Sequence, residues 1–523
     1  MKIVSSGHMR ELDRRTIEEF GTPGDVLMDR AGASVASQVQ RVAELSGLPD
    51  PFVQLIAGRG NNGGDVFAAA YHLKKRGLLV EVCLAGSADQ VRGDARTHLQ
   101  RMRAEEIDLH ELATLEDWKD AKESLPAGDI IVDGLLGTGA KGPARGPIAG
   151  AITYIRHQAP DVMVIAIDTP SGLDADTGLV EGEAVQADVT VTMGLPKTGL
   201  IEPDALEYVG DLEVADIGFP DEYIEQTPGD PLREVIVESD LYPLFPRRVR
   251  RSHKGDYGHV LMIGGSRQYT GAIMLAARAA MRSGSGLVTA VVPESLVASL
   301  SAAMPEVIVR GAQETDEGAL ASDLWKTWSG RIEDYDALLI GPGMTRHEET
   351  RRLVQQILKD ASLPIVMDAD AISVCADDVD ALTSATSSLV LTPHPGEFAA
   401  LLGLSVKDVQ RDRVTHALDA AKRLNATMVL KGAHTVVAQP EPPVHINVCG
   451  NPGMATGGTG DVLAGILTSF IGQGLAPFDA ARSAVFLHGR AGDMAAWRKT
   501  QAGMIATDII DELPFALRAL SMR

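Results

Sequence analysis

The recurring unit that most constrains this chain is a short, unbroken apolar run followed by a glycine-containing loop and a helical segment. In the first half the runs are FVQLIAG (52–58), LVEVCLAG (79–86), DIIVDGLLGTG (129–139), VMVIAIDTPSGLD (162–174) and ADVTVTMG (187–194). Apolar runs that do not alternate with polar residues are typical of parallel strands covered on both faces. Strands that alternate with helices predict an α/β fold with right-handed crossovers.

The same unit starts again in the second half. The runs there are HVLMIGGS (259–266), LVTAVVP (287–293), ALLIGPG (337–343), PIVMDADAI (364–372), LVLTPHPGE (389–397) and TMVLKGAHTVVA (427–438), each expected to form a strand. Between the halves, residues 220–246 are Pro-rich and acidic and lack long periodic segments, as a junction does. Since 523 residues exceed one ordinary core, we expect domains at 1–222 and 241–523, joined by a linker at 223–240.

Charge and cysteine content exclude several classes of protein. A formal net charge of −23 argues against a general nucleic-acid binder, because phosphate contacts need a basic face. The basic stretch RRVRRSHKGDYGH (247–259) is either a solvated edge of the junction or a local anion site. Three widely spaced cysteines without a CxxC pair suit a reducing compartment, and no apolar signal core or long apolar run is present. We expect a cytoplasmic protein without a membrane span.

Polar and glycine-rich loops follow the predicted strands in both halves. In open α/β sheets, ligands bind beyond the carboxyl ends of the strands, so each half is expected to hold a site. The loops are 61–65, 133–142 and 168–174 in the first half, and 264–266, 341–343, 393–397, 431–435 and 457–461 in the second.

The loop in NPGMATGGTGDVLAGI (451–466) raises a specific question. Glycines let a ligand approach the backbone N–H groups, and a helix N-terminus favours an anion. Asp461 beside such a cradle could remove a proton from a hydroxyl that attacks a phosphoryl group. The alternative is an ordinary glycine turn in which Asp461 only caps the helix. Because GxxxxGK[ST] is absent, a nucleotide site here would not be a P-loop.

Several motifs, taken together, carry a resemblance to a known family. KGDYGHVLMIGGS, LLIGPGM, DADAI, LTPHPGEFAALL, LKGAHTVV and NPGMATGGTGDVLAGI occur in one order in the second half. This half resembles the ADP/ATP-dependent NAD(P)H-hydrate dehydratases, which have a ribokinase-like fold. In the first half, GRGNNGGD, VDGLLGTG and AIDTPSGLDADTG resemble NAD(P)H-hydrate epimerase, a Rossmann-like domain. The whole chain therefore resembles the bifunctional NAD(P)H-hydrate repair enzymes.

The resemblance implies a repair reaction on hydrated nicotinamide cofactors. The epimerase would interconvert the R and S hydrates of NADH and NADPH (NADHX and NADPHX). The dehydratase would use ADP or ATP with Mg²⁺ to remove water from the S hydrate, releasing AMP (from ADP) and phosphate. Small molecules would be its partners, and a homo-oligomer is expected.

Residue roles in the second half follow from the same resemblance. Asp461 would be the catalytic base, and Glu397 would lie near Mg²⁺. Taken alone, Lys431 could be a surface residue and His394 a satisfied loop histidine. The residues implied to contact the hydrate are Ala272, Gly343, His394 and Asp461, and those implied to bind the nucleotide are Lys431, Gly432, Ala433, His434, Thr435 and Gly460.

In the first half, Asp168 would be the catalytic acid or base. Asn62, Asp133 and Ser171 would bind K⁺, for which oxygen ligands are suitable. Without the resemblance, Asp133 and Asp168 would be interpreted as caps or turn residues. The residues implied to bind the hydrate are Asn61, Asn62, Gly63, Gly64, Asp65, Gly137, Thr138, Gly139, Ala140, Lys141, Gly142, Pro143 and Asp168.

Val66 departs from the epimerase pattern NNGGDG, where a glycine is expected. If the chain has already entered a helix at this point, the substitution changes little; if the glycine allows close approach of substrate, epimerisation suffers. We expect the first. Two other functions compete with repair: a metabolic kinase that makes a stable phosphate ester, and a ligand-binding regulator without turnover.

Overall fold

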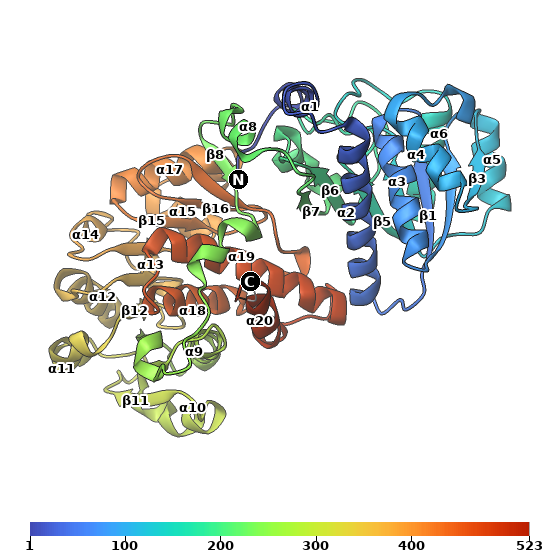
Figure 1. Ribbon diagram of the computed structural model, residues 1–523. Helices are drawn as coiled ribbons and strands as arrows, with labels where there is room; N and C mark the ends of the chain where they lie inside the picture. The colour runs from blue at the N-terminus through green and yellow to red at the C-terminus, as the bar shows by residue number, and fades with distance from the viewer. Residues whose placement is uncertain (522–523) are drawn as a thin grey trace. The chain divides into compact units, whose positions relative to one another are not determined.

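The computed structural model describes residues 1–521, and the chain divides into two compact units, Met1–Asp230 and Pro231–Arg523 (Figure 1). Each unit is built around one sheet. The prediction of two α/β folds is confirmed.

The first unit has a seven-stranded sheet in which all neighbouring strands are parallel. Its first six strands follow the order 3-2-1-4-5-6, which is the Rossmann order. From edge to edge the strands are β3 (Asp108–Glu111), β2 (Leu79–Leu84), β1 (Phe52–Ala57), β4 (Ile130–Gly134), β5 (Met163–Ile167), β6 (Val189–Met193) and β7 (Asp211–Ala215).

Helices cover both faces of this sheet. On one face α3 packs against α2 and α4, and on the other α5 and α6 pack around buried Trp118 and Tyr154. In this three-layer arrangement, loops lie at the carboxyl ends of the strands. The helices are α1 (Ser6–Glu18), α2 (Gly24–Leu45), α3 (Asn61–Lys75), α4 (Gly93–Arg103), α5 (Leu115–Ser124), α6 (Pro147–Gln158), α7 (Leu206–Val209) and α8 (Asp221–Gln226).

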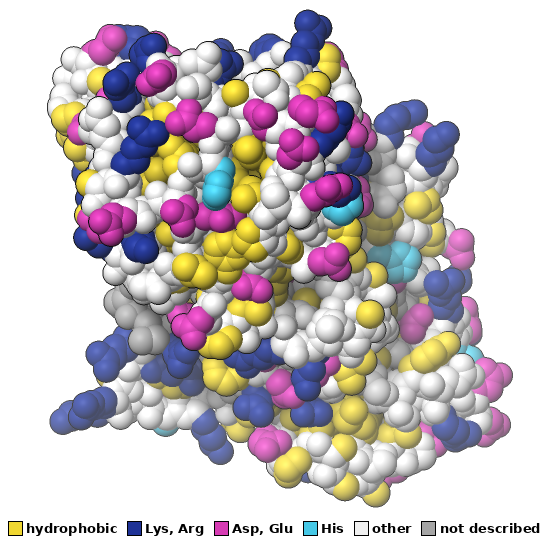
Figure 2. Space-filling view, turned by 90° about the vertical axis from the view of Figure 1, so that its right-hand side faces the viewer, with side chains coloured by type: hydrophobic (Ala, Val, Ile, Leu, Met, Phe, Trp, Pro, Cys, Tyr) yellow, Lys and Arg dark blue, Asp and Glu magenta, His cyan; other side chains and the backbone are white. Residues whose placement is uncertain are grey.

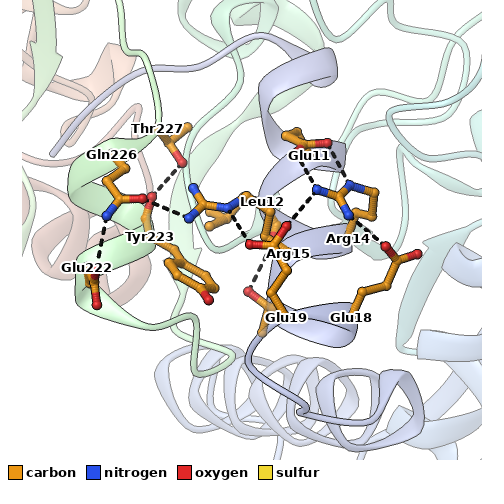
Figure 3. A network of polar contacts seen from close by, with 11 residues as sticks. Glu11, Leu12, Arg14, Arg15, Glu18, Glu19, Glu222, Tyr223, Gln226 and Thr227 are labelled. Atoms are coloured by element: carbon orange, nitrogen blue, oxygen red, sulfur yellow. Dashed lines mark hydrogen bonds and ion pairs between the residues drawn. The ribbon is translucent and has the colours of Figure 1, made fainter.

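A polar network ties α8 to α1 inside the first unit (Figure 3). The Arg15 guanidinium donates to Gln226 Oε1 at 2.7 Å and lies 4.1 Å from the centroid of the Tyr223 ring. Residues at the start of the expected linker therefore belong to the first unit.

The second unit has a ten-stranded sheet that is parallel except around β16, which pairs antiparallel with both neighbours. The run 427–438, expected to be one strand, is a hairpin of β15 and β16, because the chain turns back at 431–434. From edge to edge the strands are β11 (Ile308–Ala312), β10 (Leu287–Pro293), β9 (His259–Ile263), β12 (Ala337–Ile340), β13 (Ile365–Met367), β14 (Leu389–Leu391), β15 (Thr427–Leu430), β16 (Thr435–Ala438), β17 (Val444–Asn447) and β8 (Arg233–Val235).

Alternate residues of these strands face two separate cores. Val260 and Met262 join the core that contains α9 and α18, while Leu261 and Ile263 join the core on the opposite face. Burial on both faces explains the unbroken apolar runs. The helices are α9 (Thr270–Arg282), α10 (Val297–Ala303), α11 (Leu324–Trp328), α12 (Glu348–Asp360), α13 (Asp370–Ser373), α14 (Asp380–Thr383), α15 (Pro395–Leu402), α16 (Val406–Arg411), α17 (Arg413–Leu424), α18 (Thr459–Gly472), α19 (Pro477–Lys499) and α20 (Ala506–Ser521).

In both sheets the strand order changes direction between two neighbouring strands. The reversal lies between β1 and β4 in the first unit and between β9 and β12 in the second. Loops on either side of such a point diverge and leave a crevice at the carboxyl ends of the strands. The expected site loops in each unit follow these strands and their neighbours.

The surface does not gather its charge in one area on the face shown in Figure 2, where acidic and basic side chains are interspersed. Within residues 1–521, no helix is both long and apolar enough to cross a bilayer. Cys83, Cys375 and Cys449 form no disulfide bond within the described residues.

Candidate active sites

The glycine loop of the second unit leads directly into α18. Its N-cap is Gly458, at φ +94°, and Asp461 lies in the first helical turn. The alternative in which Asp461 caps the helix is therefore wrong, and its carboxylate is left for another role. The Thr459 hydroxyl donates to the carbonyls of Met454 and Thr456, which holds the loop in place.

A partly buried ion pair lies beside this loop. Lys431 Nζ lies 2.7 Å from Asp368 Oδ1, and the same carboxylate accepts the Thr392 hydroxyl at 2.7 Å. A Cβ on Gly460 would lie 3.2 Å from Lys431 Nζ, so the glycine keeps room for the ammonium group. Lys431 is thus no ordinary surface residue, since its side chain is 19% exposed and paired. Asp368, its partner, received no role in the sequence-based interpretation.

Burial, together with these charges, sets the protonation of Asp461. Burial raises the pKa of Asp461 to about 7, the negative charge of Asp368 adds to the rise, and Lys431 opposes it. For Lys431, burial disfavours the charge, but the carboxylates of Asp368 and Glu397 outweigh it and raise the pKa. A carboxyl that titrates near neutral pH is suited to act as a general base.

The hairpin between β15 and β16 presents the expected nucleotide residues. Gly432 has φ +146°, and a Cβ there would lie 2.3 Å from the Arg413 guanidinium. His434 has φ +52° although it is not a glycine. The Thr435 hydroxyl donates to the Gly432 carbonyl at 2.9 Å, which closes the turn.

His394 and Glu397 form a capping box at the start of α15. The His394 Nδ1 accepts the backbone N–H groups of Gly396 and Glu397, and Glu397 Oε2 accepts the His394 N–H at 2.8 Å. His394 is thus a satisfied loop histidine in this structure, with a side chain 57% exposed. Among the described residues, no group of three or more His, Cys, Asp or Glu side chains is arranged to hold a metal ion.

Ala272 and Gly343 line one pocket of about 450 Å³. It opens beyond β9, β12 and β13, and Asp370 on its wall contributes to the raised pKa of Asp461. The structure therefore brings two of the four predicted hydrate contacts into one pocket close to Asp461. The other lining residues are Gln268, Tyr269, Thr345, Arg346 and Ala369.

In the first unit, the three predicted K⁺ ligands gather around the loop after β4. Ser171 donates its N–H and its hydroxyl to Asp133 at 2.8 and 2.7 Å. The Leu136 N–H donates to Ser171 Oγ, and the Leu136 carbonyl accepts from Asn62 Nδ2 at 2.8 Å. Burial raises the pKa of Asp133 to about 6, which the hydrogen bonds from Ser171 partly offset.

Asp168 lies at the end of β5 with φ +65°, a strained conformation for a residue other than glycine. Lys197 Nζ donates to Asp168 Oδ1 at 2.6 Å, to the Thr192 hydroxyl at 2.9 Å and to the Met193 carbonyl at 2.9 Å. Lys197 is completely buried. Sequence reasoning missed Lys197, although a lysine after a buried strand in GLPKTG was a usable signal.

Two further carboxyls lie within electrostatic reach of this pair. Burial raises the pKa of Asp13 to about 6, with Lys197 opposing and Asp168 adding to the rise. Burial also raises the pKa of Asp65 well above its usual value, and Asp168 and Asp13 contribute. Asp13, on α1, was missed as well, because nothing in the sequence of a helix marks one carboxylate as partly buried.

The remaining predicted epimerase residues occupy two segments. Asn61–Asp65 form the first turn of α3, and 137–143 form the loop after β4. A Cβ on Gly137 would lie 3.4 Å from both Asn62 Oδ1 and Asp168 Oδ2, so the two segments meet at Asp168. Val66 is fully buried inside α3, which confirms the expectation that the chain is already helical there.

Comparison with known proteins identifies both halves. Residues 260–515 match the family model described as NAD(P)H-hydrate dehydratase, and residues 24–199 match that of the YjeF-related protein N-terminus. The bifunctional NAD(P)H-hydrate repair enzyme Nnr of Moorella thermoacetica is 41% identical over 520 residues, which is 99% of this chain and 97% of the relative. That of Thermofilum pendens is 38% identical over 520 residues, again 99% and 97%.

The chain belongs to the family of bifunctional NAD(P)H-hydrate repair enzymes. As a member, it combines an NAD(P)H-hydrate epimerase with an ADP/ATP-dependent NAD(P)H-hydrate dehydratase. The kinase and regulator alternatives are set aside.

Solved structures of the dehydratase part of the family exist. The ADP/ATP-dependent NAD(P)H-hydrate dehydratase of Bacillus subtilis, co-crystallised with ATP/Mg²⁺, is 29% identical, has a TM-score of 0.47 and covers 55% of this chain and 98% of its own. A ribokinase-like superfamily protein of Enterococcus faecalis is 29% identical, with a TM-score of 0.49 and coverage of 56% and 97%.

Proposed function

We propose that the two activities reside in separate units, with epimerisation of the R and S hydrates in Met1–Asp230 and dehydration of the S hydrate in Pro231–Arg523. The observation that supports the second assignment best is Asp461, whose pKa is raised to about 7 at the start of α18 beside the Lys431–Asp368 pair. The expected catalytic domains, 1–222 and 241–523, lie within these two units.

In the dehydratase, Asp461 takes the proton of the C6 hydroxyl while the hydroxyl oxygen attacks the terminal phosphorus of the nucleotide. The bond from that phosphorus to the leaving phosphate oxygen breaks, so ADP yields AMP. The phosphorylated C6 then loses phosphate, and a proton leaves C5, which restores the ring double bond. The N–H groups of 457–460 face the anionic oxygens.

The nucleotide contacts and Mg²⁺ are assigned on the same basis. Lys431–Thr435 and Gly460 hold ADP or ATP, and Ala272, Gly343 and His394 hold the hydrate. Oxygen donors suit Mg²⁺, and Glu397 lies close enough to raise the pKa of Lys431. When bound with the nucleotide, Mg²⁺ would neutralise charge on its phosphates.

In the epimerase, Asp168 is the acid or base that moves a proton to and from the C6 hydroxyl oxygen of the hydrate, and Lys197 holds the Asp168 carboxylate in position. Segments 61–65 and 137–143 surround the ring, because both reach Asp168.

Asn62, Asp133 and Ser171 suit K⁺. They supply hard oxygen donors around one loop, and no ion pair to the buried Asp133 carboxylate is present among the described residues. We expect K⁺ to raise the thermal midpoint of the enzyme above pH 6, where Asp133 is ionised. This rise of the thermal midpoint should vanish in Asp133→Asn. It should also vanish when K⁺ is replaced by an equal concentration of a bulky organic cation. An equal K⁺ shift in Asp133→Asn would contradict this site.

We further expect only small molecules as partners (NADHX, NADPHX and ADP or ATP), with a homo-oligomeric enzyme that acts in the cytoplasm and binds no nucleic acid. The net charge of −23 is consistent with this expectation.

The test is recovery of the absorbance of reduced nicotinamide from a mixture of R and S NADPH hydrates, with Mg²⁺, K⁺ and ADP or ATP. Full recovery requires both activities, after correction for spontaneous epimerisation. Recovery of the S share alone would mean that the first unit is inactive. No recovery with either nucleotide would refute the proposed mechanism.

Asp461→Asn is the matched variant for this experiment. We expect it to lower dehydration by roughly 10²–10⁴-fold, the usual contribution of a general base. Epimerisation, followed by chromatography of the two hydrates, should be unchanged, because Asp461 belongs to the other unit. Normal dehydration by Asp461→Asn would refute its role as the base.

A further inference from the structure

The pocket beside Asp461 contains groups that the proposed reaction has not used. Three segments line it: the loop after β9, the loop after β12 and the residues after β13. These strands are neighbours in the sheet. Tyr269, Arg346 and Asp370 are the large or charged side chains of its wall.

Gly343 fixes where Tyr269 lies. A Cβ on Gly343 would lie 2.6 Å from the Tyr269 carbonyl oxygen and 3.0 Å from Tyr269 Cβ, and Gly343 has φ +67°. The backbone after β12 can therefore approach the start of α9 only because residue 343 lacks a side chain. The close contact holds Tyr269 at the pocket wall.

Tyr269 is unusually exposed to solvent for an aromatic residue. It is 55% exposed, although most large apolar side chains of this unit are buried. A flat ring on a pocket wall, anchored through its backbone, offers a stacking surface at low entropic cost.

The rest of the pocket wall is strained and charged. Thr345 has φ +67° and Ala369 φ +49°, and neither is a glycine. Asp370 accepts the Thr345 N–H at 2.8 Å, which stabilises the strained loop. Strain of this kind persists at sites where a side chain must be presented in one direction.

That loop presents Arg346. Its side chain is 73% exposed, and its Nε lies 4.0 Å from Asp370 Oδ1, beyond hydrogen-bond distance. An exposed pair of this length contributes little, so the guanidinium is available to an anion. By contrast Lys431, on the Asp461 side, is already bonded to Asp368 at 2.7 Å.

We propose that Tyr269 and Arg346 are the residues that bind the dinucleotide hydrate in this pocket, Tyr269 by stacking on the hydrated ring and Arg346 by binding a phosphate group of the same molecule. The proposal rests on the dehydratase assignment of the second unit. A guanidinium can bind either the bridging diphosphate or the 2′-phosphate of NADPHX, because both present paired anionic oxygens.

The experiment compares Arg346→Gln, Tyr269→Ala and Tyr269→Phe with Arg331→Gln as the control. Arg331 is an exposed arginine that precedes β12, at the amino edge of the sheet and away from the pocket. For each variant of the full chain, Kd for NADHX and for NADPHX is measured by titration without nucleotide, and kcat and KM are measured with ADP or ATP.

Arg346→Gln should raise Kd and KM roughly tenfold to 100-fold, with kcat nearly unchanged because Asp461 is intact. An equal loss of affinity for both hydrates identifies the diphosphate as the group that Arg346 binds. A loss of affinity confined to NADPHX identifies the 2′-phosphate. Tyr269→Ala should raise Kd about tenfold, whereas Tyr269→Phe should bind as wild type.

Unchanged Kd values in Arg346→Gln and Tyr269→Ala would overturn the proposal, even with normal turnover. The proposal would also be overturned if the wild-type protein bound neither hydrate, or if Arg331→Gln lost as much affinity as Arg346→Gln. Binding that depends on Arg346 without any turnover by wild type would support this inference and refute the proposed reaction instead.

Discussion

At the scale of single residues, each unit holds a lysine, fully or largely buried, that is bonded to an aspartate at the end of a parallel strand. Lys431 pairs with Asp368 at 2.7 Å, and Lys197 pairs with Asp168 at 2.6 Å. In both places a further carboxyl with a raised pKa lies nearby, Asp461 in the second unit and Asp65 in the first. Each lysine thus allows several carboxyls to share a buried site.

The raised pKa of Asp461 makes a prediction about pH. A base acts only when ionised, and Asp461 is ionised above about pH 7. We expect kcat/KM for dehydration to fall about tenfold per pH unit below that value and to be level above it. Asp461→Asn should show a low, level profile. A wild-type profile without a break near neutral pH would contradict the assignment.

The Lys197–Asp168 pair predicts a linked loss of stability and activity. Lys197→Met leaves the Asp168 charge uncompensated in a buried site and should cost about 3–5 kcal/mol of unfolding free energy in the first unit. Epimerisation should be lost and dehydration retained. Adding Asp168→Asn should restore stability, measured by denaturant unfolding, without restoring epimerisation. Normal epimerisation by Lys197→Met would refute the positioning role.

At the scale of elements, helix starts place the functional groups. The α3 helix begins at Asn61 after Gly60, and α18 begins at Thr459 after Gly458, so both glycine loops end as free helix N-termini. In α3, a Cβ on Gly63 would lie 1.9 Å from the Gly58 carbonyl oxygen. The glycine there permits close packing of helix on strand.

Val66 belongs to this packing. It is fully buried, and a Cβ on Gly134 would lie 2.2 Å from Val66 Cγ2, so the valine fills the space above that glycine. Val66→Gly should therefore destabilise the first unit by about 3 kcal/mol, through the cavity and the lower helix propensity of glycine. Thermal unfolding with Val66→Ala as the control tests this. A Val66→Gly protein that is equally stable and faster in epimerisation would contradict it.

At the scale of the whole molecule, the chain changes unit near Asp230. Residues 233–235 form β8, which pairs with β17, and Ile236 is buried in the core of the second unit. The expected linker at 223–240 thus contains α8 on one side and β8 on the other.

This division predicts which fragments of the enzyme fold on their own. A fragment of residues 231–523 should fold and retain dehydration, because it keeps β8 and Ile236. A fragment of residues 241–523 should have a lower thermal midpoint and aggregate, because it exposes the edge of β17. Equal midpoints and solubility of the two fragments would show that β8 adds nothing to the sheet.

The sequence by itself determined what is local. Unbroken apolar runs predicted buried parallel strands, and glycine loops after them predicted two sites. Motifs such as GGTGD and KGAHT indicated the family and its chemistry. These features are readable because strand burial and helix starts depend on neighbouring residues.

Only the tertiary structure decided which distant groups meet. Lys197 and Asp168 are separated by 29 residues, and Lys431 and Asp368 by 63. The raised pKa of Asp461 and the turn at 431–434 likewise depend on elements packed from elsewhere in the chain. Burial and charge are properties of a site in three dimensions, so no local pattern in the sequence reports them.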